Sequence, residues 1–69
     1  MNINVRYKAK KYDVVLDHYG AVDVFLRIND KEFKLKRNYV DKFRSPGKLL
    51  SSGSLRKLAI DLIDTDSNI

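Results

Sequence analysis

Basic side chains alternate with aromatic rings in two stretches of this 69-residue chain. Four cations surround two tyrosines within residues 6–12, and further cations surround Tyr39 and Phe43 within residues 36–48. Proteins that bind nucleic acids combine cations for the phosphates with rings on which bases stack. The net charge of +5 and the isoelectric point of about 9.6 fit the same function.

The sequence therefore predicts a small, basic, non-enzymatic regulatory protein that binds DNA or RNA through a lysine and arginine surface. The alternative is a compact interaction protein, an inhibitor or adaptor of the kind that phages and mobile elements encode, with its basic face docked on an acidic host protein. Charge complementarity accelerates both kinds of association, so net charge does not separate them. The residues expected to contact either partner are Arg6, Lys8, Lys10, Lys11, Lys34, Lys36, Arg37, Lys42, Arg44 and Lys48.

Catalytic and metal chemistry find little support in the sequence. With no cysteine and one histidine, the chain lacks the ligands of a Cys/His zinc site. Asp17 cannot orient His18 as a general base, because neighbouring residues of a strand point to opposite faces. Asp13, Asp17 and Asp23 could share a face and hold a cation, but basic partners are expected beside them. We predict no catalytic residue, no metal and no cofactor.

The charge is unevenly distributed along the chain. Residues 1–12 carry four bases and no acid, whereas residues 13–30 carry one base and four acids. Residues 31–48 carry seven bases and two acids, and residues 49–69 carry two bases and three acids. The acidic central strands neutralise part of the excess, which leaves residues 6–11 and 37–48 as the cations available to a partner.

The clearest structural signal is a β-hairpin over residues 22–36. Asn-Asp at positions 29 and 30 separates two alternating segments and suits a two-residue type I′ turn. The turn fixes the register, so that Arg27 faces Glu32 and Asp23 faces Lys36 as internal ion pairs.

Two more strands are expected upstream. Residues 12–18 pair with the same central strand across a loop at residues 19–21, which places Val15 opposite Phe25 and Asp17 opposite Asp23. Residues 3–9 also alternate, and a strand there places Arg6, Lys8 and Lys10 on one face. All three of these cations are expected to contact the partner.

Downstream of the hairpin, the alternation gives way to helical spacing. Asn38 is expected to cap a short helix over residues 39–43, and residues 45–47 break the chain. Serine hydroxyls at residues 51–54 precede an amphipathic helix whose apolar stripe is Leu55, Leu58, Ala59, Leu62 and Ile63. The fold class is α+β: a three- to four-stranded antiparallel meander with the C-terminal helix packed on one face.

One domain over residues 1–64 is expected, with residues 65–69 as a frayed tail. The sequence shows no signal peptide and no apolar run that could span a bilayer, so a cytoplasmic location without membrane association is expected. The face that holds Val15 and Phe25 has no predicted cover, and the first strand is an edge. A homodimer through that face or edge is therefore a further possibility.

Overall fold

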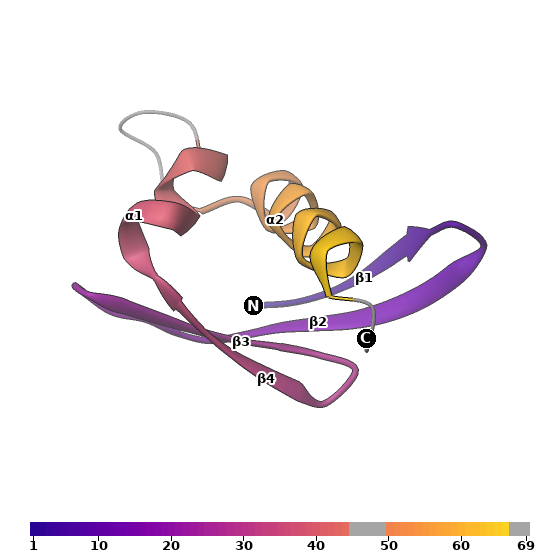
Figure 1. The fold of residues 1–69 in the computed structure, drawn as a ribbon, viewed down its shortest axis with the longest axis horizontal. Helices are drawn as coiled ribbons and strands as arrows, with labels where there is room; N and C mark the ends of the chain where they lie inside the picture. Colours follow the sequence, from indigo (N-terminus) through magenta and orange to yellow (C-terminus); the bar gives the residue numbers. More distant parts are fainter. Residues whose placement is uncertain (45–49, 67–69) are drawn as a thin grey trace.

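The computed structural model describes residues 1–44 and 50–66 and confirms the α+β fold. Four antiparallel strands follow one another in the order β1-β2-β3-β4, and the helical segments come after them (Figure 1). Their bounds are β1 Asn2–Tyr7, β2 Lys10–Tyr19, β3 Asp23–Ile28, β4 Lys31–Lys36, α1 Arg37–Val40, the 3₁₀ helix η1 Asp41–Phe43 and α2 Ser52–Thr65.

The core lies between α2 and one face of the sheet (Figure 1). The predicted stripe of α2 supplies buried side chains, with Ile63 partly buried at its edge. The alternating residues of the first three strands meet them, since period two places every second side chain on the same face. The fully or almost fully buried residues are Val5, Tyr12, Val14, Val24, Leu26, Ile28, Val40, Leu50, Leu55, Leu58, Ala59 and Leu62.

The β3–β4 hairpin has the predicted register and turn. Asp23 is opposite Lys36 and Arg27 is opposite Glu32. Asn29 and Asp30 take the left-handed conformation that a type I′ turn requires, with φ of 49° and 68°. Lys36 Nζ lies 3.6 Å from the Asp23 carboxylate, which confirms that ion pair.

The predicted register between β2 and β3 is wrong, because β2 continues through Tyr19, which was expected in the loop, and Tyr19 lies opposite Val24. Val15 lies opposite Arg27, and it is His18 that lies opposite Phe25. The pairing also shifts between Leu16 and His18, and this β-bulge leaves Asp17 without a facing residue on β3. The unfavourable pair of Asp17 and Asp23 is absent from the observed register on either side of the bulge.

Asp17 instead pairs with Arg27. Arg27 Nε and Nη2 donate to its two carboxylate oxygens at 2.8 and 3.0 Å. The bidentate geometry is the strong form of this interaction and holds the pKa of Asp17 below its usual range. The expected ion pair between Arg27 and Glu32 is therefore wrong, although the two residues do face each other.

The first strand is shorter than expected and ends at Tyr7. Lys8 and Ala9 form a two-residue turn with φ of 51° and 63°. Arg6 then lies opposite Lys11 on the face away from the helix, whereas Lys10 lies opposite Tyr7. The prediction that Arg6, Lys8 and Lys10 share a face is wrong, because period two stops at the turn.

The segment after β4 begins its helix earlier than predicted. α1 starts at Arg37 with Lys36 as its N-cap, so Asn38 is not the capping residue, and η1 continues from it. The break predicted at residues 45–47 lies outside the described residues.

Helix α2 starts at Ser52, within the serine-rich segment expected to cap it. Ser51 is the N-cap, and its hydroxyl oxygen accepts the Ser54 N–H at 3.2 Å. The helix runs through Thr65, one residue into the predicted tail, and Lys31 Nζ lies 2.7 Å from the carboxylate of its C-cap residue, Asp66. Residues 67–69 of the predicted tail lie outside the described residues. Within the described ranges, no helix is long and apolar enough to cross a membrane.

Candidate nucleic-acid interface

The structure separates the predicted contact residues into two groups. Arg6, Lys8, Lys10 and Lys11 surround the β1–β2 turn, and we call this segment the basic hairpin. The other group lies near α1, at the opposite end of the molecule, whose longest axis measures 33 Å (Figure 1). The two groups therefore do not form one continuous surface. The α1 group contains Lys34, Lys36, Arg37, Lys42 and Arg44, and Lys48 lies outside the described residues.

Two lysines of the α1 group share one carboxylate. Lys34 Nζ and Lys36 Nζ lie 4.0 and 3.6 Å from the Asp23 carboxylate. Both side chains are well exposed, so each pair is worth little, but together they lower the local excess of positive charge.

Two arginines of the α1 group converge on Asp41. Arg44 Nε lies 2.8 Å from one carboxylate oxygen and Arg37 Nε lies 3.7 Å from the other. The Tyr19 hydroxyl donates to the same carboxylate. The hydrogen bonds from Tyr19 and Arg44 hold the pKa of Asp41 below its usual range. This cluster ties α1 and η1 to the end of β2, and Lys42 remains exposed beside it without an ion pair to any described residue.

The basic hairpin is different, because three of its four cations form no ion pair within the part of the chain that the structure describes. Arg6, Lys10 and Lys11 are exposed and form no ion pair with any described residue. Lys8 Nζ lies 3.6 Å from Asp64, but the two side chains are 75% and 47% exposed. This exposed pair is weak, but Asp64 offsets the charge of Lys8 in part, so the excess positive charge of the hairpin comes from Arg6, Lys10 and Lys11.

The basic hairpin also departs from the rules that stabilise a hairpin. Arg6 is directly opposite Lys11, and like charges in that position are destabilising. Its turn places Lys8 and Ala9 in the left-handed conformation, which costs roughly 1–2 kcal/mol per residue unless glycine, asparagine or aspartate occupies it. Natural proteins concentrate such conflicts at functional sites.

The base of the hairpin is nevertheless firmly held. Val5 and Tyr12 are buried opposite each other in the core. The Tyr7 hydroxyl reaches both carboxylate oxygens of Asp64 on α2, at 2.8 and 2.7 Å. This hydrogen bond is the main reason that the pKa of Tyr7 is raised. The tip extends beyond the end of α2 (Figure 1), so the cations are carried on a supported projection.

Two further features were not among the predicted contacts. Arg56 and Lys57 are exposed on α2 and form no ion pair with any described residue. His18 and Phe25 lie together on the open face of the sheet, with ring centroids 6.0 Å apart. The helical spacing of the sequence could have placed Arg56 and Lys57 on the exposed face of α2, because they lie outside its apolar stripe. The contact between His18 and Phe25 depends on the β-bulge, for which the sequence gives no local signal.

Of the three aspartates considered for a cation, two form ion pairs with basic side chains. Asp17 pairs with Arg27, and Asp23 pairs with Lys34 and Lys36. In residues 1–44 and 50–66, no three histidine or acidic side chains come together in a way that could hold a metal ion.

Comparison with known proteins finds no matching family model, no matching curated protein and no matching solved structure.

Proposed function

We propose that this chain is a small non-enzymatic regulatory protein of the cytoplasm that binds duplex DNA through the basic hairpin. The observation that carries the proposal is the facing pair Arg6 and Lys11, which repel each other and have no carboxylate partner among the described residues. A phosphate placed between them would supply the negative charge that the folded chain does not provide.

The shape of the hairpin favours a duplex. A two-stranded β-ribbon fits the major groove of B-form DNA, whose phosphates line both sides of the ribbon. Arg6 and Lys11 project from one face of the ribbon, Lys10 is on the other, and Lys8 occupies the tip. The cations can thus reach both walls of the groove. The deep, narrow major groove of A-form RNA does not admit such a ribbon, so DNA is the preferred duplex.

The experiment replaces Arg6, Lys10 and Lys11 together by glutamine and measures binding to a mixed-sequence DNA duplex by fluorescence anisotropy over a range of salt concentrations. Removing one cation from a phosphate should lower the slope of log K against log salt by about 0.9. For the triple variant, we expect the slope to fall by about 2.7 and the affinity at low salt to fall steeply.

The matched control replaces Lys42, Arg56 and Lys57 by glutamine. These cations are also exposed and unpaired among the described residues, and the decrease in net charge is the same. The control should retain most of the wild-type slope. Equal decreases in both triple variants would refute a localised interface, and an absence of DNA binding at low salt would refute the function itself. A stoichiometric protein partner that survives nuclease treatment would then favour the alternative of an acidic protein surface.

A further inference from the structure

We propose that a cavity between β2 and the α1–η1 segment binds a small organic monoanion, a carboxylate attached to a compact apolar group. The cavity measures about 190 Å³ and is lined by Leu16, Tyr19, Arg37, Arg44 and Leu50. Sites for drug-sized molecules span roughly 300–1,000 Å³, so the ligand of this cavity must be smaller than those.

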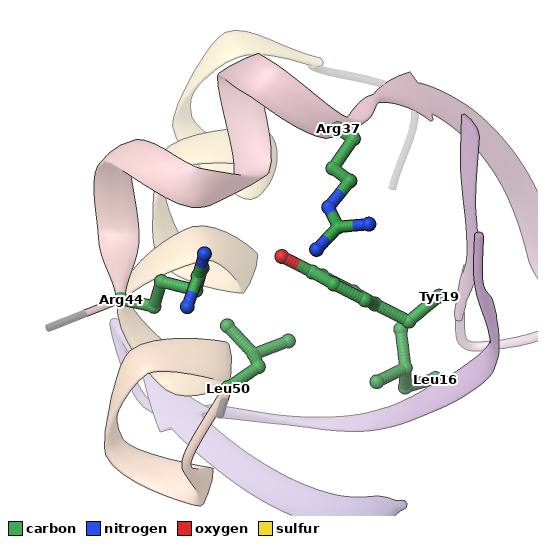
Figure 2. A pocket seen from close by; sticks show the side chains of 5 residues that line it. All are labelled: Leu16, Tyr19, Arg37, Arg44 and Leu50. Atoms are coloured by element: carbon green, nitrogen blue, oxygen red, sulfur yellow. The ribbon is translucent and has the colours of Figure 1, made fainter. Parts of the chain in front are cut away.

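The apolar part of the site comes from β2 and from the residue that precedes the cap of α2. Leu16 and Leu50 lie on one side of the cavity, and the ring of Tyr19 projects between them and the arginines (Figure 2). Leu50 is almost fully buried and belongs to the core. These side chains can cover an apolar ligand group without rearrangement, because the core already holds them in place.

The charged part of the site is the pair of arginines. Figure 2 shows their guanidinium groups on either side of the Tyr19 hydroxyl, facing the cavity. The Arg37 guanidinium carbon lies 4.9 Å from the centre of the Tyr19 ring, and its Nη1 donates to the Gly20 carbonyl at 3.4 Å. The stacking and the hydrogen bond orient this guanidinium before any ligand arrives.

The contacts of Arg37 favour an anionic ligand. Arg37 and Arg44 both contact the Asp41 carboxylate, to which the Tyr19 hydroxyl also donates. Arg37 Nε lies 3.7 Å from that carboxylate, which is beyond hydrogen-bond distance, so this guanidinium keeps donors for a second anion. A bound carboxylate with one negative charge would accept charge-assisted hydrogen bonds from Arg37.

This site does not depend on the proposed binding of DNA. It lies beside α1, and the basic hairpin lies at the other end of the molecule (Figure 1). The cavity and the basic hairpin have no residue in common, so each proposal can fail alone.

The test uses the full chain, benzoate as the probe and benzamide as its neutral counterpart of similar shape. Backbone amide signals are followed by NMR during titration with each compound at constant ionic strength. Benzoate should shift the signals of Leu16, Tyr19 and Leu50 in a saturable way and bind about tenfold more tightly than benzamide, since hydrogen bonds to charged groups contribute about that factor. Equal affinity for the two compounds, or shifts confined to residues 6–11, would overturn the proposal.

A pair of variants then assigns the anion contact. Arg37→Gln should weaken benzoate binding about tenfold and leave benzamide binding unchanged. Lys42→Gln removes the same charge from an exposed residue that does not line the cavity, and it should bind benzoate like the wild type. The dispersion of the NMR spectrum reports whether each variant is folded. Equal weakening by both variants would mean that only the general field of the protein attracts the ligand, which contradicts the proposed site.

Discussion

The two outer hairpins of the sheet close with the same kind of turn, but only one of them has residues that favour it. Both close with two residues in the left-handed conformation. The β3–β4 turn uses Asn29 and Asp30, and the Asn29 side chain also accepts the Asp13 N–H at 2.9 Å. The basic hairpin makes the same turn with Lys8 and Ala9, whose side chains do not favour it.

The facing charges also favour the β3–β4 hairpin over the basic hairpin. In the β3–β4 hairpin, Asp23 faces Lys36 and the two form an ion pair. In the basic hairpin, Arg6 faces Lys11 and neither has a carboxylate partner among the described residues. One hairpin is arranged for stability, and the other keeps its cations available at a cost in stability. That difference is why we assign the interface to the basic hairpin.

The largest expected effect compares a fully buried position of the β3–β4 hairpin with a half-buried position of β1. Leu26→Ala in β3 removes a fully buried side chain and should lower the free energy of unfolding by about 2–5 kcal/mol. Ile3→Ala in β1 removes a half-buried side chain and should cost clearly less. Urea denaturation measures both, with Val22→Ala, at a position 65% exposed, as the control. A smaller decrease for Leu26→Ala than for Ile3→Ala would contradict the burial of these two side chains in the structure.

The next largest effect on stability is expected from glycine substitutions in the two turns. Ala9→Gly should raise the free energy of unfolding by about 0.5–1 kcal/mol, because glycine avoids the left-handed penalty but loses some chain entropy. Asp30→Gly at the corresponding position of the other turn should have a smaller effect, since aspartate already tolerates that conformation. Equal increases in urea denaturation would show that the two turns are under equal strain.

Charge reversal should act in opposite directions in the two hairpins. Arg6→Glu creates an opposite-charge pair with Lys11 and should stabilise the fold by about 0.2–1 kcal/mol. Lys36→Glu places a carboxylate against Asp23 and should destabilise it by a similar amount. Urea denaturation again measures both. The two variants change the net charge equally, so a shift of the same sign in both would point to the overall charge and not to the facing residues.

The smallest effect concerns the attachment of the basic hairpin to α2. The Tyr7 pKa is raised, mainly by its hydrogen bond to Asp64, so this contact contributes stability below pH 10 and loses it as the pH rises through the raised pKa. The unfolding free energy of the wild type should therefore fall more between neutral and strongly alkaline pH than that of Tyr7→Phe. Parallel pH profiles of the two proteins would show that the hydroxyl contributes nothing measurable.

The sequence was most informative where several local signals agreed. In the β3–β4 hairpin, the turn residues, the apolar alternation and the facing charges all specified one register. The serine cap and the apolar stripe likewise located α2. The turn at Lys8 and Ala9 was missed because its residues do not favour a turn, and it is imposed by the pairing of Val5 with Tyr12 in the core.

The candidate interface was predicted only in part. The sequence showed which residues are basic. It did not show that these residues separate into two groups at opposite ends of the molecule, because that depends on how the strands pair. The pairing of Arg37 and Arg44 with Asp41 depends on the contact between α1 and β2, which has no local signal. The bulge at Asp17 has the same origin, since Arg27 lies ten residues further along the chain.

The most direct test compares the affinity of Arg6→Glu and Lys36→Glu for the same DNA duplex at one low salt concentration. The two variants have identical net charge and alter opposite ends of the sheet. If the basic hairpin binds the duplex, Arg6→Glu loses most of its affinity and Lys36→Glu retains most of it. Equal affinities would contradict the assignment, as would a weaker affinity for Lys36→Glu than for Arg6→Glu.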